Sequence, residues 1–186
     1  TKDARAAYEA ALRIEPKYAD ALLNLGTLLQ DTGDTVAAIA TFNRLLEVTP
    51  DAAQAHYNIG KCHHLQGRLD QAQRALAKAI ALDPTFADAH FAMANLLADR
   101  DSPESAISQI EIAIKLKPNW AEAISNWGNF LCTLNRHEDA LVKYEQSLIL
   151  DANNQNTRTN YGLALLTLGL LERGWSFYRS RIGSDA

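Results

Sequence analysis

Cysteine, proline, glycine and methionine are all scarce in this chain of 186 residues, which contains 2 Cys, 5 Pro, 9 Gly and 1 Met. Two cysteines are too few for a disulfide framework, and no apolar run approaches the roughly 20 residues that a membrane span needs. Positive charge is not in excess either, since 18 Lys+Arg stand against 22 Asp+Glu. Nucleic-acid binding needs a basic surface. We therefore expect a soluble, cytoplasmic protein that neither inserts into a membrane nor binds nucleic acid.

The familiar catalytic and cofactor-binding motifs are also missing. The sequence has no glycine-rich phosphate loop, no Gly-x-Ser-x-Gly elbow and no His-Glu-x-x-His helix. We therefore expect that this chain is not an enzyme, has no catalytic residues and needs no cofactor.

What the sequence does contain is an internal repeat. Four of the prolines, Pro16, Pro50, Pro84 and Pro118, follow one another at intervals of 34 residues. A column of small residues keeps the same interval: Gly26, Gly60, Ala94, Gly128 and Gly162. A fixed period of this length predicts an array of similar structural units.

Each repeat reads as two helices. In the first complete repeat, Leu22, Leu25 and Leu29 form one apolar stripe at helical spacing. Gly33 then interrupts the pattern, and a second stripe with Phe42 follows before Pro50 ends the second helix. Because strand-type alternation of apolar and polar residues is absent, the pattern predicts an all-α fold.

The period, the small-residue column and the prolines together resemble the tetratricopeptide repeat (TPR) family. The resemblance implies an all-α solenoid of stacked antiparallel helix pairs that winds into a right-handed superhelix. We read residues 1–186 as a single array. Its parts are the second helix of a partial repeat at 1–18, full repeats at 19–52, 53–86, 87–120 and 121–154, and a last repeat at 155–186 that ends in a capping or junction helix.

The start in mid-repeat leaves Tyr8, Leu12 and Ile14 without the helix that precedes them in the family pattern. A terminal repeat normally needs a polar outer face. We expect that the chain is a piece of a longer array or that another chain covers this edge. Self-association through the terminal helices is therefore a further expectation.

The histidines and cysteines suggest a metal site only at first sight. His56, Cys62, His63 and His64 lie close together, and His90 occupies the next repeat. A zinc site needs converging ligands, whereas neighbours on one helix point in different directions. His56, His63 and His90 also share columns with Leu, Ile or Arg. We interpret them as packing residues and expect no metal.

The resemblance implies that the first helix of each repeat lines a concave groove in which extended peptides bind. The candidate groove residues are Asn24, Asn58, Asn126, Asn160, Asn95, Asn129, Tyr57, Phe91 and Lys61. Asparagine is a mediocre helix former, so its return to one mid-helix column needs a reason. Its amide can pair with a peptide backbone, or it can tie neighbouring first helices together. Both interpretations stay open at this stage.

One family subtype holds a C-terminal carboxylate with a clamp of lysines and arginines on the first helices. Here the corresponding column contains Asp20, Gln54, Asp88 and Glu122, and Lys61 is the only cation of the predicted groove. A carboxylate needs several donors or cations within reach. The sequence therefore disfavours a carboxylate clamp.

Two functions fit these observations. The first is a scaffold that binds a peptide or a partner protein and performs no chemistry. The second is the substrate-recognition region of a larger glycosyltransferase, because the array resembles the N-terminal region of O-linked N-acetylglucosamine transferases. The segment with Gly174, Trp175, Tyr178 and Arg181 resembles one that ends many bacterial TPR arrays, although Ser180 replaces an expected aromatic residue. We predict that this segment is a cap or a junction to a catalytic domain, and the two roles are compatible.

Overall fold

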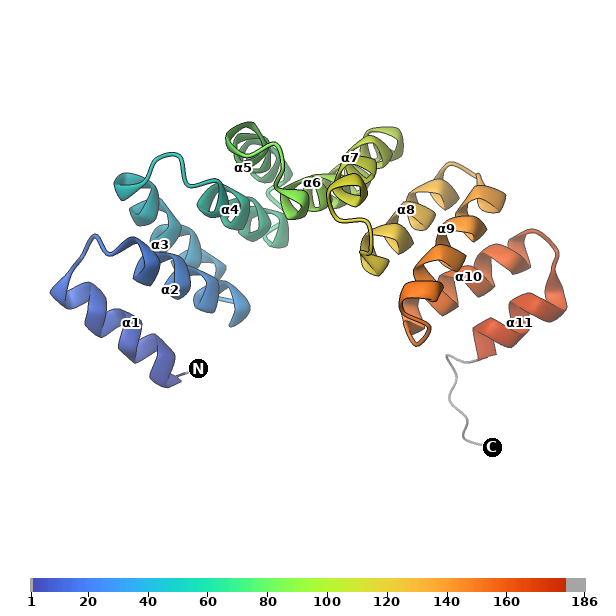
Figure 1. Cartoon of the computed structure of the whole chain (residues 1–186), viewed down its shortest axis with the longest axis horizontal. Helices are drawn as coiled ribbons and strands as arrows, with labels where there is room; N and C mark the ends of the chain where they lie inside the picture. Colours follow the sequence, from blue (N-terminus) through green and yellow to red (C-terminus); the bar gives the residue numbers. More distant parts are fainter. Residues whose placement is uncertain (1, 180–186) are drawn as a thin grey trace. The chain divides into compact units, whose positions relative to one another are not determined.

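The computed structural model describes residues 2–179, and every regular element in that range is an α-helix (Figure 1). The helices are α1 (Lys2–Ile14), α2 (Ala19–Asp31), α3 (Thr35–Val48), α4 (Ala53–Leu65), α5 (Leu69–Leu82), α6 (Ala87–Asp99), α7 (Pro103–Leu116), α8 (Ala121–Thr133), α9 (His137–Leu150), α10 (Gln155–Thr167) and α11 (Leu171–Arg179). The first helices of successive pairs begin at residues 19, 53, 87, 121 and 155. The predicted all-α fold of stacked helix pairs is confirmed.

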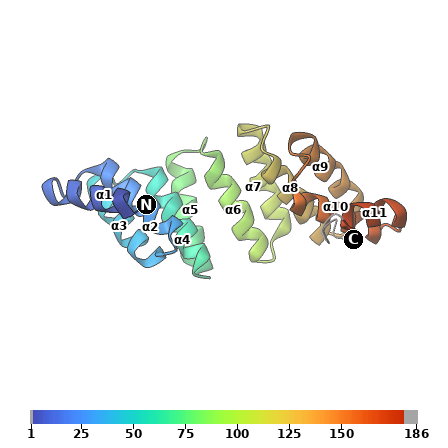
Figure 2. The ribbon, with the colours of Figure 1, turned by 90° about the horizontal axis from the view of Figure 1, so that it is seen from below.

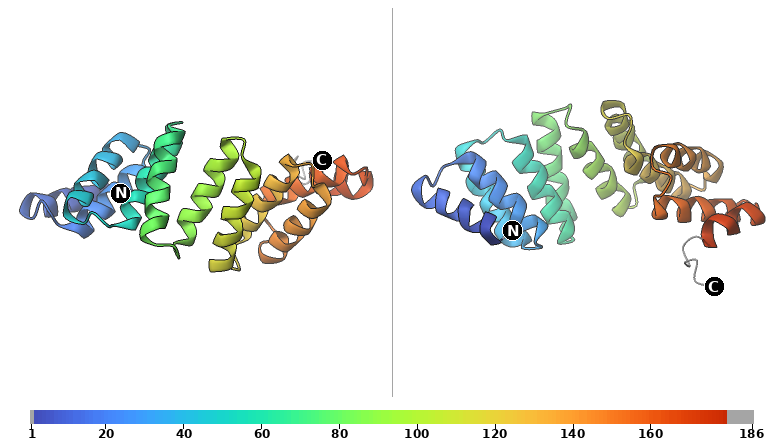
Figure 3. Two further views of the ribbon diagram at one scale, coloured as in Figure 1. Left: turned by 90° about the horizontal axis from the view of Figure 1, so that it is seen from above. Right: turned by 60° about the horizontal axis from the view of Figure 1, so that its bottom comes forward.

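The chain forms two compact units, residues 1–96 and 97–186, which we call unit 1 and unit 2. Within unit 1, α2 packs on α3, α3 on α4 and α4 on α5 (Figure 2). Within unit 2, α8 packs on α9, α9 on α10 and α10 on α11 (Figure 3). Within each unit, most contacts join helices that are neighbours in sequence, as expected for a solenoid.

The turn inside each helix pair depends on one residue with a left-handed backbone. Positive φ angles occur at Gly33, Gly67, Asp101, Asn135 and Gly169, which are 34 residues apart. Glycine adopts this conformation without steric cost, and Asn and Asp tolerate it better than other residues. At each turn a backbone N–H also bonds to a carbonyl five residues earlier, as from Asp34 to Leu29 at 2.9 Å. This pattern satisfies the end of the first helix and redirects the chain into the second.

The small-residue column lies where the two helices of a pair touch. A Cβ atom on Gly60 would lie 2.7 Å from Cγ of Leu76, and a Cβ atom on Gly128 would lie 2.6 Å from Cε1 of Tyr144. Both distances are shorter than any normal contact between carbon atoms. These positions therefore allow the helices to approach more closely than alanine would permit.

Each unit has its own buried core. In unit 1 the core combines side chains of α1 to α4, with Leu22 and Phe42 fully buried. In unit 2 it includes Leu131, Tyr144, Tyr161 and Leu165. Aromatic residues contribute large apolar areas to such cores.

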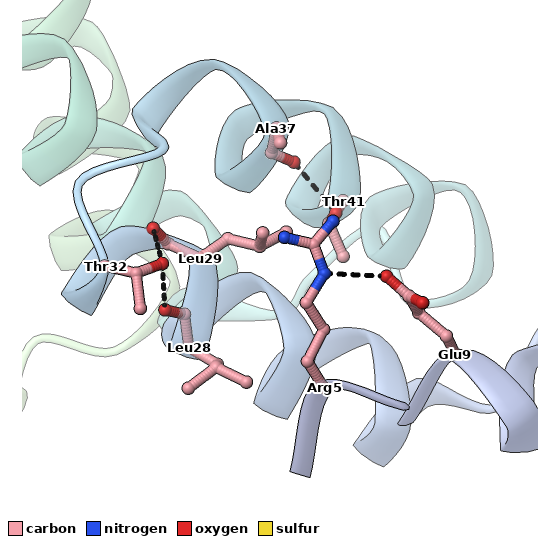
Figure 4. A network of polar contacts seen from close by, with 7 residues as sticks. All are labelled: Arg5, Glu9, Leu28, Leu29, Thr32, Ala37 and Thr41. Carbon is pink, nitrogen blue, oxygen red and sulfur yellow. Dashed lines mark hydrogen bonds and ion pairs between the residues drawn. The ribbon is translucent and has the colours of Figure 1, made fainter. Parts of the chain in front are cut away.

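The edge formed by α1 is partly covered. Leu12 is buried against the core of unit 1 and Tyr8 packs beside it, whereas Ile14 is 88% exposed. Figure 4 shows Arg5 and Glu9 of α1 paired at 2.8 Å near the end of α2, where the Thr32 hydroxyl bonds to the carbonyl oxygen of Leu28. Polar side chains thus lie beside one part of the contact between α1 and α2.

Candidate functional site

The predicted asparagine column occupies one position on four first helices, but its surroundings differ. Asn24 on α2 is exposed, whereas Asn58 on α4 is only 4% exposed. Asn126 on α8 and Asn160 on α10 are half-buried. The side chain of Asn58 accepts a hydrogen bond from Gln54 at 3.4 Å. One residue type therefore serves in three different environments.

In unit 1 the first helices present aromatic side chains beside a cation. The Tyr57 and Phe86 rings are 4.9 Å apart, centroid to centroid, and tilted by 52°. The Lys61 ammonium lies 5.3 Å from the centre of the Tyr57 ring, within the range of a cation–π contact. Phe91 and Asn95 are half-buried on α6. This surface can contact apolar groups, and Lys61 adds a positive charge.

In unit 2 three predicted residues are brought together by hydrogen bonds. Oδ1 of Asn129 accepts one bond from Nδ2 of Asn160 at 2.9 Å and another from the Tyr144 hydroxyl at 2.8 Å. Nδ2 of Asn129 in turn donates to Oδ1 of Asn126 at 3.5 Å. We call the bond between Asn129 and Asn160 the amide bridge. It joins α8 to α10 across 31 residues of sequence.

The Tyr144 hydroxyl is a permanent donor to this bridge. Its side chain is 1% exposed, and burial, together with a hydrogen bond to Cys132, raises the pKa of Tyr144 far above its ordinary value. Burial disfavours the charged phenolate, so the group keeps its proton. The neutral Tyr144 hydroxyl therefore donates a second hydrogen bond to Oδ1 of Asn129 and helps to hold the amide bridge in place.

On one side of the amide bridge lies a cleft of about 330 Å³, which we call the polar cleft. Its lining residues come from α8, α10 and the turn before α10: Glu122, Ser125, Asn126, Asn129, Asn154, Asn156, Thr157 and Asn160. The hydroxyls of Thr157 and Ser125 bond to each other at 2.9 Å across the two helices. Side-chain amides carry both donors and acceptors. The polar cleft can therefore pair with N–H and C=O groups of a peptide.

On the other side of the amide bridge lies a second cleft of about 350 Å³, which we call the apolar cleft. It is lined by Asn129, Cys132, His137, Tyr144, Asn160, Leu163, Ala164 and Thr167. Leu163 is 44% exposed there. Burial raises the pKa of the Cys132 thiol, which keeps it uncharged. Most of the cleft surface is apolar.

The histidines singled out for a metal site instead lie near the turns between repeats. Nε2 of His56 is 3.2 Å from the carbonyl oxygen of Pro50, and Nε2 of His90 is 3.1 Å from that of Pro84. Within residues 2–179, no group of three or more His, Cys, Asp or Glu side chains is arranged to hold a metal ion. Both cysteines are free thiols, and burial raises the pKa of Cys62 to about 11.

The predicted cap or junction residues lie on α11, except Arg181, which lies outside the described residues. Gly174 is buried against Leu166. Trp175 is 46% exposed and meets the Tyr178 ring edge to face at 5.8 Å. The ring that covers α10 is that of Phe177, which contacts Tyr161 edge to face at 4.8 Å.

Aromatic residues of α8 and α10 also interact with charged side chains of the second helices α9 and α11. The Tyr161 hydroxyl donates to Glu145 at 2.5 Å and accepts a bond from Arg173 at 3.0 Å. Nζ of Lys143 lies 3.5 Å from the centre of the Trp127 ring, and burial lowers the pKa of Lys143. These contacts hold α9 and α11 onto the first helices.

Several lining residues were not identified from the sequence. Asn154 carries a recognisable signal, because Asn directly before a helix is a common N-cap; it accepts the Thr157 backbone N–H at 3.0 Å. Leu163 also has a recognisable signal, because its column is polar in the earlier repeats and belongs to the predicted groove face. The residues of that column are Thr27, Lys61, Asn95 and Asn129. Cys132, His137 and Tyr144 have no such signal, because only packing brings them to the cleft.

Comparison with known proteins identifies similar families and folds. Two family models, both described as tetratricopeptide repeat, match this chain, one at residues 1–49 and 24–85 and the other at residues 63–125. No curated protein matches the sequence. No helix within residues 2–179 is long and apolar enough to span a membrane.

Three solved structures illustrate the shared fold. Pseudomonas aeruginosa PilF has a TM-score of 0.82 and 21% identity, over 90% of this chain and 78% of PilF. MamA has a TM-score of 0.75 and 23% identity, over 83% of this chain and 91% of MamA. YrrB, described as a TPR protein with an unusual peptide-binding site, has a TM-score of 0.73 and 20% identity, over 92% of this chain and 88% of YrrB.

Proposed function

Because the chain belongs to the tetratricopeptide repeat family, we propose that it is a non-catalytic protein-interaction module. Its ligand is an extended peptide or a peptide-like segment of a partner protein, held by the faces of the first helices. The peptide-binding site described for the similar protein YrrB agrees with this proposal.

The polar cleft of unit 2 is the observation that carries the proposal. Its side chains offer donors and acceptors from two successive first helices, and Glu122 is its only charged lining residue. An extended strand presents alternating N–H and C=O groups. Amide and hydroxyl side chains can pair with these groups whatever the peptide side chains are. The cleft therefore suits a backbone better than it suits one charged small molecule.

The first helices of unit 1 carry a separate surface, which we propose also contacts peptides. Tyr57 and Phe91 offer aromatic surface, and Lys61 adds the cation that lies over Tyr57. Apolar peptide side chains gain free energy when such surface is covered. A carboxylate near Lys61 adds a charge-assisted contact. We therefore expect peptides that bind this surface of unit 1 to contain apolar and acidic residues.

The test replaces Asn126 with alanine and measures binding of peptides selected by phage display on the whole chain. At about 1 kcal/mol per lost hydrogen bond, affinity falls about 5- to 10-fold. The melting temperature changes less than in a variant at the buried Asn58, because Asn126 is half-buried whereas Asn58 is only 4% exposed. Isothermal titration calorimetry gives the affinity and thermal unfolding gives the stability.

Asn43→Ala is the matched control, since Asn43 is an exposed mid-helix asparagine on the second helix α3. It leaves binding unchanged. Asn58→Ala is the contrasting variant: Asn58 is buried, so its loss lowers the melting temperature. Unchanged affinity in Asn126→Ala would contradict the proposed site.

A second candidate function is the substrate-recognition region of a larger glycosyltransferase. It is supported by the exposure of Trp175 at 46% and of Leu171 at 58% on α11. Such residues suit a junction with a further domain. The deciding observation is the reading frame after Ala186. About 300 or more residues with alternating strand and helix patterns would support this function, and an early stop codon would contradict it.

Self-association also remains a prediction. Ile14 on α1 is 88% exposed, and Trp175 on α11 is 46% exposed, so both terminal helices present apolar side chains. Sedimentation velocity on the whole chain separates a monomer from larger species. Cytoplasmic location and the absence of nucleic-acid binding stay predictions from composition.

A further inference from the structure

We propose that the apolar cleft of unit 2 is a specificity subsite, which receives one apolar side chain of a peptide whose backbone lies in the polar cleft. This inference rests on the proposed function and names the chemistry that its site prefers. The occupant is an aliphatic or aromatic side chain, about as large as that of leucine or phenylalanine.

The position of the cleft is the first argument. The polar and apolar clefts share two lining residues, Asn129 and Asn160, which form the amide bridge between them. The polar cleft extends over the N-terminal halves of α8 and α10, and the apolar cleft over their C-terminal halves. A peptide residue whose backbone contacts the bridge therefore has the apolar cleft within reach of its side chain.

The state of the polar groups is the second argument. Asn160, Asn129, Tyr144 and Cys132 bond to one another, and the Thr167 hydroxyl bonds to the carbonyl oxygen of Leu163. Among the described residues, Nδ1 of His137 has no hydrogen-bond partner and is the one buried polar atom of the lining left unpaired. No Asp, Glu, Lys or Arg lines the cleft. A charged ligand side chain would lose its water without gaining an oppositely charged partner, which is unfavourable. An apolar side chain loses nothing of this kind and gains from leaving water.

The repeat pattern is the third argument. Leu163 occupies a column that contains Thr27, Lys61, Asn95 and Asn129 in the preceding repeats. The polar residue typical of this face is thus replaced by leucine in one repeat only. Leu163 is nevertheless 44% exposed and lines the cleft. Leu163 therefore adds apolar surface to the cleft at a position that is polar in the earlier repeats, and an apolar ligand group would cover that surface.

The size of the cleft fits such a group. Its volume is about 350 Å³, whereas an engineered cavity of about 150 Å³ in another protein is large enough to bind benzene. The side chain of leucine or phenylalanine can therefore enter without displacing the surrounding helices.

The experiment uses two blocked peptides, acetyl-Gly-Leu-Gly-amide and acetyl-Gly-Ser-Gly-amide, titrated into the whole chain and followed by NMR. The leucine peptide shifts the amide signals of Leu163, Ala164 and Thr167 saturably, with a dissociation constant on the order of 1–10 mM, typical for a ligand of this size. The affinity of the serine peptide is lower by a factor of about five or more, because this peptide leaves the apolar surface uncovered.

Two variants of one position and a matched control locate the effect. Leu163→Asn, which restores the polar pattern of the earlier repeats, and Leu163→Ala each weaken the leucine peptide about three- to tenfold. Both leave the serine peptide unaffected. Leu170→Ala is the control, since Leu170 is 43% exposed in the same unit but does not line the cleft. The Leu170→Ala variant binds the leucine peptide and the serine peptide as tightly as the unaltered chain does.

The outcomes distinguish this inference from the proposed function. Equal binding of the two peptides, or no saturation up to about 50 mM, overturns the subsite, even if Asn126→Ala still weakens the selected peptides. A preference for leucine that Leu163→Asn does not change also overturns it. If Asn126→Ala has no effect while the leucine preference depends on Leu163, the subsite stands and the proposed backbone site fails.

Discussion

At the scale of single residues, side chains of one type have different roles in different repeats. Asn24 is exposed, Asn58 is buried beside Gln54, and Asn160 donates to Asn129 on the preceding first helix. The sequence left ligand binding and a structural tie open for the whole column. The hydrogen bonds indicate a tie at Asn160, whereas Asn126 remains a lining residue of the polar cleft with a long bond at 3.5 Å.

A second residue-scale feature is the close contact at Gly128. The ring of Tyr144 that faces it is buried, and the Tyr144 hydroxyl is held by Asn129. The ring therefore cannot swing away from an added methyl group.

We expect Gly128→Ala to lower the free energy of unfolding by about 1–3 kcal/mol, which is typical of overpacking. Helix propensity alone predicts the opposite sign, a gain of about 1 kcal/mol. Urea denaturation measures the difference. A higher midpoint than in the unaltered chain would show that the contact is relieved cheaply.

At the scale of elements, α11 is held on α10 by backbone proximity and by one aromatic contact. A Cβ atom on Gly162 would lie 3.0 Å from the backbone nitrogen of Tyr178. The Phe177 ring packs on Tyr161, whose hydroxyl links Glu145 and Arg173. Trp175, by contrast, is half exposed. Within the described residues, the aromatic contact between α11 and α10 is therefore made by Phe177.

Replacing Phe177 with alanine should destabilise unit 2 by about 1–3 kcal/mol, because the half-buried ring loses its contact with Tyr161. Trp175→Ala is the matched aromatic variant on the same helix and should cost about 0.5 kcal/mol or less. Thermal unfolding separates them, since 1 kcal/mol shifts the melting temperature by roughly 2–4 °C at this chain length. A larger loss from Trp175→Ala would assign the capping role to Trp175.

At the scale of the whole molecule, stability is distributed over two compact units. Repeat proteins are stabilised mainly by contacts between nearest neighbours, so a local change weakens its own surroundings most. Each unit contains one thiol, Cys62 in unit 1 and Cys132 in unit 2, and burial raises the pKa of both. Each thiol therefore reports the opening of its own unit.

Gly60→Ala and Gly128→Ala make the same change at corresponding positions of the two units. In the folded chain at pH 8 the thiolate is disfavoured, and opening returns the thiol to an ordinary pKa of about 8.5. Gly60→Ala should accelerate alkylation of Cys62 more than that of Cys132, and Gly128→Ala should do the reverse. Iodoacetamide labelling followed by peptide mass spectrometry measures both rates. Equal acceleration of both thiols in both variants would mean that the units open together.

The sequence by itself determined the helix pairs, their 34-residue period and the glycine turn at Gly33. These features depend on interactions within one repeat: apolar spacing, helix ends and residues that tolerate a left-handed backbone. The close approach at Gly60 and Gly128 also follows from the small-residue column, because the period places both positions at the same helix contact.

Only the tertiary structure decided how the candidate site is built. The amide bridge joins residues 31 apart, and the Tyr144 hydroxyl reaches Asn129 across 15 residues and from another helix. Periodicity places such residues on a face but does not specify their rotamers or partners. Rotamers and partners depend on how neighbouring helices pack. The two clefts and the contact of Phe177 with Tyr161 are therefore visible only in the packed arrangement of α8 to α11.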